Sequence, residues 1–334
     1  MSAEMAPTYR DQEQRLNDQW PFNYDSLLVE DGQRPVGFRF SKHIVNIKAR
    51  LGQRELIVTG EADTSGLAHV KARAELLERS TLLAVGSTYN AETSNGWAAH
   101  PDKDQARINA ILELVERDAV LAQWYSSTPF LELSQHQWPF EIQEWALNEL
   151  ARSEFPRMRL LLSTRGIGPS VTCLLVNQQG FGVSTHATRA NLVESIRAAI
   201  SEACRPAHSS IRREHWATTL KLKAGMGDPS AAEAHAVYYA YHEPFPQWMF
   251  GECVTFEQAS TLWEQGIAKL IGDDSQFQFT IARGAPLIVG FAKHPDAFDL
   301  RWGTTDVDWV AASAGAKRLG LSTNKINKSI HIVS

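Results

Sequence analysis

The sequence predicts an α/β (α+β) fold in which mixed sheets pack against long helices that carry glutamates. Two observations support this class. Segments of alternating apolar and polar residues, typical of half-buried strands, lead directly into segments with helical periodicity. Two of the helical segments share the pattern Glu-x-x-Glu-Arg, with apolar residues between the carboxylates. A chain of 334 residues can bury a large core between such layers.

The N-terminal stretch, residues 1–34, is predicted to be a loosely ordered lead-in with Trp20 as an anchor. We expect residues 35–334 to form a single domain. A hairpin through Gly52 should bring the chain to the first glutamate helix. The strands expected here lie at residues 36–40, 44–51 and 54–60.

The first glutamate helix follows capping groups at Asp63 and Thr64 and is expected to stop at Gly86. The second is predicted at residues 103–125, after a small-residue turn at 94–96, because apolar residues recur there at spacings of three and four. Before it, Asp102 can accept hydrogen bonds from free backbone N–H groups, with Gln105 at the capping-box position. The first helix carries Glu75, Glu78 and Arg79, and the second carries Glu113, Glu116 and Arg117.

A third helix is predicted at residues 188–205, closed by Pro206, with Glu194 and Glu202 near one face. Three strands deliver the chain into it. A further helix at 256–270 follows a capping box. The capping box is Thr255 with Gln258. The other expected elements are two helices, five strands and a polar tail. The helices are expected at 138–153 and 306–319, and the strands at 158–163, 171–176, 180–185, 277–281 and 286–291.

The repeated carboxylates have two interpretations. A single Glu-x-x-Glu-Arg is most often a solvated helix face with weak local ion pairs. Two copies flanked by apolar residues favour another use: if the helices pack together, four or five carboxylates converge. At about 4 Å and an effective dielectric near 20, each like-charged pair repels by about 4 kcal/mol. Mg²⁺, a hard cation that prefers oxygen ligands, would relieve this repulsion and hold a nucleotide triphosphate.

The residues in order resemble the YcaO superfamily, whose members bind ATP and Mg²⁺ through glutamates on three helices and phosphorylate a peptide backbone amide. The resemblance extends over residues 35–300. It is carried by three blocks: Gly60 and Thr64 leading to Ala72 and Glu75–Arg79; Ser94-Asn95-Gly96 leading to Ala106-Arg107 and Glu113–Arg117; and Ala199–Glu202.

The resemblance implies ATP and Mg²⁺ as cofactors and assigns roles without a catalytic nucleophile. The implied metal ligands are Glu75, Glu78, Glu116 and Glu202, with Glu113 as another ligand or a partner of one. The implied nucleotide contacts are Ser94 and Asn95 on the turn, with Arg79 and Arg117 on phosphate oxygens or orienting the carboxylates, and Arg205.

The chain departs from the family pattern at four places. Lys71 stands where the first helix usually has Ser, His100 where the second turn usually ends in Gly, and Arg205 where the third helix usually has Gln. Azoline-forming members usually end in a proline-rich tail that reaches their active site, whereas residues 327–334 contain no proline. The tail bears on ring formation more than on ATP binding.

The function implied is ATP- and Mg²⁺-dependent O-phosphorylation of a peptide backbone amide in the maturation of a ribosomally made peptide, with azoline formation at Cys, Ser or Thr. Alternatives are a thioamide- or amidine-forming enzyme, a non-catalytic scaffold subunit of a modification complex, and an unrelated ATP-dependent ligase. Expected partners are the precursor peptide and a leader-binding protein, in a homodimer or a heteromeric complex.

Composition bears on nucleic-acid binding, membrane association and cysteine-based sites. A net charge of −5 argues against nucleic acid as the main partner. The sequence has no run of about 18 apolar residues and no signal-peptide core, so we expect a cytoplasmic protein without membrane association. The cysteines lack zinc or disulfide spacing.

Several single residues also have expected roles. Cys173 is expected in the core, and Cys204, near Glu202, is at most a candidate nucleophile. Trp97 is expected to pack in the core rather than stack on adenine. Residues 206–233 are expected to form a loop over the site. Scattered histidines, His208, His215, His235 and His242, are not expected to bind metal.

Overall fold

The computed structural model describes residues 20–33, 43–89, 93–148, 150–207, 238–272, 274–302 and 305–333. The strand predicted at 36–40, residues 208–233 of the predicted loop, and three of the four histidines lie outside this part. The chain divides into two compact units. The first unit is Met1–Ile111 with Gln278–Lys293, and the second is Leu112–Phe277 with His294–Ser334.

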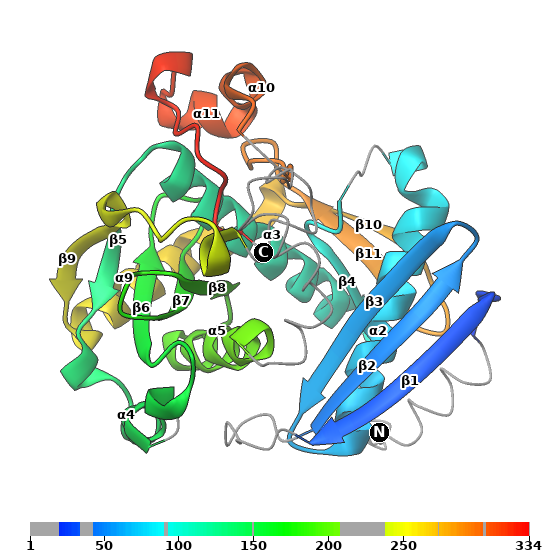
Figure 1. Ribbon diagram of the computed structural model, residues 1–334. Helices are drawn as coiled ribbons and strands as arrows, with labels where there is room; N and C mark the ends of the chain where they lie inside the picture. The colour runs from blue at the N-terminus through cyan, green and yellow to red at the C-terminus, as the bar shows by residue number, and fades with distance from the viewer. Residues whose placement is uncertain are drawn as a thin grey trace, which may run out of the picture. The chain divides into compact units, whose positions relative to one another are not determined.

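The first sheet of the first unit is an antiparallel meander of β1 (Ser26–Gln33), β2 (His43–Leu51) and β3 (Arg54–Ala62) (Figure 1). The predicted hairpin through Gly52, which has a φ of +60°, is confirmed. Strand β1 was not predicted, because its apolar residues do not alternate and Leu27 and Leu28 stay half exposed. Its ladder with β2, rather than burial, holds it in place.

Helix α2 (Ser65–Val85) follows β3 and packs on it closely. Thr64 is the N-cap, and its Oγ1 accepts from the Leu67 N–H at 3.4 Å. Gly60 has no room for a side chain, since a Cβ there would lie 2.0 Å from the carbonyl oxygen of Ala68. One face of α2, with Ala68, Ala72 and Leu76, joins the core of the meander.

The opposite face of α2 packs on a second sheet, of order β10-β11-β4. Its strands are β10 (Gln278–Arg283), β11 (Ile288–Lys293) and β4 (Trp97–His100). Sequence reasoning missed β4, which stands between the 94–96 turn and the next helix. Trp97 is buried and stacks on Phe291 with ring centroids 4.9 Å apart, so its predicted packing role is confirmed.

Helix α3 (Lys103–Tyr125) begins in the first unit and ends in the second. Both predicted ends are confirmed. The Asp102 carboxylate accepts from the Gln105 N–H at 2.8 Å, as the capping argument expected. Its C-terminal half is buried almost entirely, because Val120, Leu121 and Trp124 enter the core of the second unit.

The second unit is built on a five-stranded sheet of order β8-β7-β6-β5-β9 (Figure 1). All pairs are antiparallel except β5 with β9. Every residue of β7 and β8 is buried. The short strands β5 and β9 were not predicted, because four or five residues carry too little periodicity. The bounds are β5 (Phe130–Leu133), β6 (Arg157–Ser163), β7 (Ser170–Val176), β8 (Gly182–Ala187) and β9 (Phe250–Val254).

Three predicted helices of the second unit differ from the structure. The helix expected at 138–153 is split into shorter segments. The helix expected at 306–319 breaks at Ser313, whose extended backbone lets its Oγ cap the second half. The third glutamate helix starts at Leu192, after an Asn191 cap, and continues through Pro206. The bounds are η2 (Gln135–Gln137), α4 (Phe140–Asn148), η3 (Leu150–Arg152), α5 (Leu192–Ala207), η4 (Gln247–Met249), α9 (Phe256–Gly272), α10 (Val307–Ala312) and α11 (Ala314–Leu319).

Two other expectations concern the helix at 256–270 and the tail. The capping box is confirmed in both directions: Gln258 N–H donates to Thr255 Oγ1 at 3.1 Å, and Thr255 N–H donates to Gln258 Oε1 at 2.8 Å. The tail is not simply polar, because Ile330, Ile332 and Val333 are buried in the core. No helix within the described ranges is long and apolar enough to cross a membrane.

Candidate nucleotide and metal site

Glu116 is the most buried of the predicted metal ligands. Its position on α3 next to Val115 and Leu114, both buried, leaves it only 6% exposed. The Thr188 N–H donates to its Oε2 at 3.2 Å, and its Oε1 lies 3.7 Å from Nε of Arg117. One carboxylate oxygen is thus held by the backbone, and among the described residues the other forms a long ion pair with Arg117.

The connection between β8 and α5 shapes the other side of this group. Thr188 is fixed by a hydrogen bond from its Oγ1 to the Pro169 carbonyl at 2.9 Å, and the Arg189 N–H donates to Ser195 Oγ at 2.8 Å. Arg189 Nη2 lies 4.0 Å from Oε1 of Glu202. Two glutamates and two arginines therefore gather where this connection meets α3.

The pKa of Glu116 shows how poorly its charge is compensated. Burial raises the pKa from 4.5 to about 7, Arg117 lowers it, and the charge of Glu202 raises it further. Arg189 and the Thr188 N–H lower it by smaller amounts. A cation bound to this carboxylate would remove the penalty that burial imposes.

This donor set fits Mg²⁺. Within the described residues, no three His, Cys, Asp or Glu side chains lie close enough to form a metal cage. Mg²⁺ does not require one, since it commonly uses one or two carboxylates together with substrate phosphates and water. Glu116 and Glu202 supply two carboxylates of this kind.

Three other residues named from the sequence belong to the second unit. Glu113 is half-buried one turn before Glu116 on α3, and has an interaction of its own. Arg205 belongs to α5 by its backbone, and its side chain is outside the described part. Cys173 is confirmed as a core residue, since it is fully buried.

In the first unit, Glu75 is already engaged. Its Oε1 pairs with Nη2 of Arg79 at 2.6 Å, and its Oε2 accepts from the Thr59 N–H at 3.3 Å. Arg79 also donates to the carbonyl of Ile57 at 3.3 Å. The pair fastens α2 to β3, which is the local ion pair that the simpler interpretation expects. A metal role for Glu75 and Glu78 stays a prediction.

The 94–96 turn offers one unsatisfied group. Gly96 adopts a φ of +73°, and the Trp97 N–H donates to the Ser94 carbonyl at 3.0 Å. The side-chain Oδ1 of Asn95 is buried and accepts no hydrogen bond within the described residues. An orphaned acceptor of this kind suits a ligand donor. Lys71, which stands where the first helix of the family usually has Ser, has a structural contact: its Nζ donates to the Glu61 carbonyl at 3.0 Å.

Sequence reasoning missed two buried histidines near Arg117. Burial lowers the pKa of His186 to about 3 and that of His331 to about 4, and in both the charge of Arg117 contributes. His186 Nε2 lies 3.0 Å from the carbonyl of Ile332, which only accepts, so Nε2 carries the proton. Ser184 donates to the same carbonyl at 2.7 Å. The segment near 332 is thereby attached to β8.

Asp118, two residues after Glu116, was also missed. It is fully buried and accepts from the N–H groups of Ile167 at 2.7 Å and Phe298 at 2.8 Å, and from Nη2 of Arg318 at 3.1 Å. It joins α3 to two loops and α11. No spacing signal marks such a residue, because its partners come from 49 to 200 positions away in sequence.

The paired carboxylates beside arginines are of the kind that can hold Mg²⁺ together with phosphate oxygens. The chain belongs to the YcaO family: the family model described as YcaO cyclodehydratase, ATP- and Mg²⁺-binding, matches residues 79–271, more than half of its length. The expected family, enzyme class and cofactors are thereby confirmed. Comparison with curated proteins gives no significant match.

Solved structures share the fold. YcaO from Methanopyrus kandleri bound with AMPPCP and Mg²⁺ is similar at 15% identity and a TM-score of 0.57, over 81% of this chain and 86% of that one. A heterocyclase in complex with substrate and cofactor is similar at 11% identity and a TM-score of 0.63, and the match covers 99% of this chain and 59% of that one. The E. coli microcin synthetase McbBCD complex with pro-MccB17 bound is similar at 10% identity and a TM-score of 0.54, and the match covers 81% of this chain and 88% of that one. These likenesses confirm the predicted fold class.

Proposed function

We propose that this protein uses ATP to phosphorylate a backbone amide oxygen of a ribosomally made peptide and so forms an azoline at Cys, Ser or Thr. The observation that carries the proposal is Glu116, a buried carboxylate with its pKa raised to about 7 beside Glu202 and two arginines. Such a group is unfavourable in the free protein and favourable once a cation is bound.

The proposed reaction closes the ring in two steps and releases ADP and phosphate. The substrate thiol or hydroxyl loses its proton to solvent as it attacks the preceding carbonyl carbon, and the resulting oxyanion takes the γ-phosphoryl group of ATP, releasing ADP. The amide nitrogen then loses its proton, a C=N bond forms, and inorganic phosphate departs with the former carbonyl oxygen. An amide oxygen is a poor leaving group until it is phosphorylated, so positioning and charge stabilisation are the main tasks of the protein.

The residues have distinct tasks in this proposal. Glu116 and Glu202 would hold Mg²⁺, which when bound stabilises the charge that develops on the transferred phosphoryl group. Arg117 and Arg189 lie at the edge of the pair and suit phosphate oxygens. We also propose Asn95 and Ser94 as nucleotide contacts. Contributions from Glu75, Glu78, Arg79, Glu113 and Arg205 remain predictions.

Two structures in the comparison support a peptide substrate and a partner by their composition, since one contains substrate and another is a multi-subunit complex with pro-MccB17. We propose a precursor peptide and a leader-binding protein as partners here, in the cytoplasm. Thioamide or amidine formation would use the same activated amide with an external nucleophile.

A non-catalytic scaffold subunit is the competing proposal, because a scaffold would not need to bind Mg²⁺ and nucleotide tightly. Isothermal titration with a non-hydrolysable ATP analogue, with and without Mg²⁺, separates the two. We expect Mg²⁺-dependent binding in the wild type and its loss in Glu116→Gln. Absence of binding in the wild type would refute the catalytic proposal for the isolated chain.

The reaction itself is tested with a candidate precursor peptide, its leader-binding protein, ATP and Mg²⁺. Azoline formation removes one water per ring from the peptide and releases one phosphate, and mass spectrometry with a phosphate assay measures both. Phosphate release with incorporation of sulfide or an amine would instead identify the thioamide or amidine reaction.

A further inference from the structure

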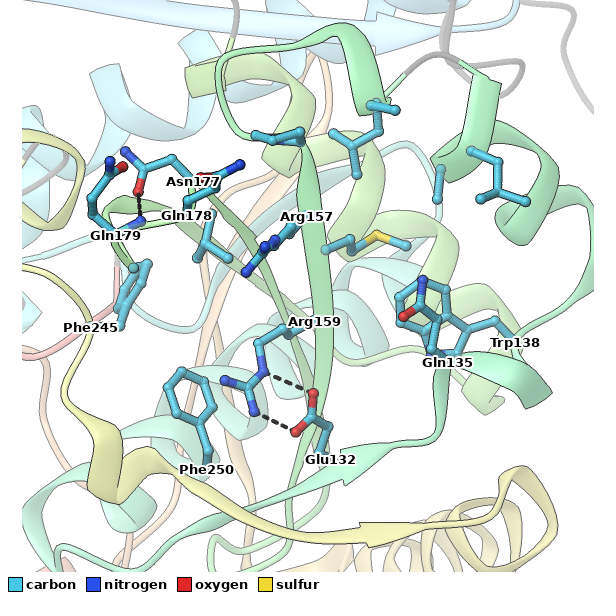
Figure 2. A pocket seen from close by; sticks show the side chains of 18 of the residues that line it. Glu132, Gln135, Trp138, Arg157, Arg159, Asn177, Gln178, Gln179, Phe245 and Phe250 are labelled. Carbon is cyan, nitrogen blue, oxygen red and sulfur yellow. Dashed lines mark hydrogen bonds and ion pairs between the residues drawn. The ribbon is translucent and has the colours of Figure 1, made fainter.

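A cavity of about 570 Å³ lies in the second unit and shares no residue with the group around Glu116. Its walls come from β5, β6, α4, the β7–β8 turn, η4 and the start of β9 (Figure 2). This volume lies within the range of ordinary ligand sites. We propose that the cavity binds an extended peptide segment through one acidic side chain and a neighbouring aliphatic one.

The charges in the cavity favour a single carboxylate. Arg159 and Glu132 neutralise each other in a two-pronged pair, with Nε to Oε1 at 2.8 Å and Nη2 to Oε2 at 2.5 Å. The Arg159 guanidinium also lies 3.4 Å from the centroid of the Phe250 ring. Arg159 is therefore held as part of the wall.

Arg157 is different. It lies two residues earlier on β6, is exposed, and forms no ion pair with any described residue. Figure 2 shows its side chain between the amides of the β7–β8 turn and the Arg159–Glu132 pair. Among the lining residues it is the one charge left uncompensated. A guanidinium in this situation matches one carboxylate in geometry and charge.

The uncharged polar groups favour peptide bonds. Five carboxamide side chains line the cavity, and a carboxamide both donates and accepts, as a peptide group does. The Oδ1 of Asn177 already accepts from the N–H groups of Gln179 and Phe181, which fixes the turn and leaves its NH₂ to donate. The five are Gln135, Asn177, Gln178, Gln179 and Gln247.

The apolar groups favour a ligand that continues past the cavity. Leu147 of α4 lines it and is 71% exposed, and Phe140, seven positions earlier and so on the same helix face, is 77% exposed. Two large exposed apolar side chains on one helix face are unusual for a surface that contacts only water. They suit aliphatic side chains of an extended segment anchored at Arg157.

The test is selection of a random seven-residue peptide library, displayed on phage, against the full-length protein. We expect enrichment of peptides with Asp or Glu beside an aliphatic residue. The same selection on Arg157→Gln should lose this acidic preference, and Lys317→Gln, which removes an exposed charge on α11, should keep it. A selected peptide, measured by fluorescence anisotropy, should bind Arg157→Gln and Leu147→Ser at least about tenfold more weakly.

The proposal would be overturned by no enrichment, by an enriched set without acidic residues, or by equal binding of a selected peptide to Arg157→Gln and the wild type. Displacement of the peptide by inorganic phosphate alone at the same concentration would indicate a simple anion site, and would also overturn it. Arg157 and Leu147 are exposed, so neither substitution should impair folding. The proposal does not depend on nucleotide binding, and Arg157→Gln should titrate with the ATP analogue as the wild type does.

Discussion

Replacing Glu116 with Gln should stabilise the free protein at neutral pH while abolishing its binding of Mg²⁺ and nucleotide. Gln has the shape of Glu and keeps an oxygen for the Thr188 N–H, but has no charge to bury. The pKa of Glu116 is raised from 4.5 to about 7. Since a tenfold change in an equilibrium constant is worth about 1.4 kcal/mol, the buried charge costs about 3 kcal/mol above pH 7.

The direction in which stability changes with pH follows from proton binding by Glu116. The folded state holds the Glu116 proton more tightly than the unfolded state, so its contribution to stability is fully present below pH 4.5 and is lost as pH rises through about 7. Wild type and Glu116→Gln should therefore have nearly equal free energies of unfolding at pH 4.5. At pH 8 the variant should be the more stable by up to about 3 kcal/mol.

Urea unfolding in EDTA between pH 4.5 and 8.5 measures this difference. Glu194→Gln, an exposed carboxylate on α5, is the control and should change stability by less than about 0.5 kcal/mol. With Mg²⁺ and the ATP analogue at about 100 times Kd, the wild type should gain about 2.7 kcal/mol and the variant nothing. If Glu116→Gln destabilises the free protein at pH 8, the carboxylate is already compensated and the metal-site reasoning is refuted.

Three further predictions concern the second unit. The pKa values of His186 and His331 lie below the ordinary 6.5, so the free energy of unfolding should fall as pH drops from 6.5 toward 4. In urea unfolding, His186→Gln should reduce the slope of this fall by about 1.4 kcal/mol per pH unit, and an unchanged slope would contradict a buried neutral His186. Asp118→Ala should cost about 3–5 kcal/mol in urea unfolding, because it leaves the Arg318 charge without its carboxylate and two backbone N–H groups without an acceptor. The exposed Asp308→Ala should have little effect in the same measurement. Gly166→Ala should cost about 1–3 kcal/mol, since its Cβ would lie 2.5 Å from Cα of Ala119, and Gly272→Ala, with open space around it, is the control in thermal unfolding.

The long helices could be predicted because their signals are local. Asp102 with Gln105 and Thr255 with Gln258 place capping oxygens within one turn of the N–H groups they serve, and α3 has the predicted ends. The hairpin through Gly52 is local in the same sense. At Ser313 the prediction was wrong: residues 306–319 were expected to form one helix, but Ser313 caps the start of a second helix within that range.

The short strands could not be predicted in this way. Strand β4 pairs with β11, about 190 positions later in the chain, and β9 pairs with β5, about 120 positions earlier. Their hydrogen-bond partners exist only in the folded sheet. The tail was expected to be polar because Ile330 and Ile332 are too few to form a periodic pattern, yet both are buried.

In the candidate site, too, some features follow from local sequence and others only from the folded structure. By itself the sequence determined the glutamate helices, because residue type and spacing along a helix set which groups share a face. Its motifs carried the resemblance to the family and the prediction of Glu116, Glu202 and Arg117 as site residues, whereas Arg189 entered only with the structure. Only the tertiary structure decided that Glu116 is buried and faces Thr188, that Glu75 is paired with Arg79, and that Arg157 is left uncompensated in a cavity. Burial and pairing depend on neighbours far away in sequence, and these set the pKa of a carboxylate and the availability of a charge.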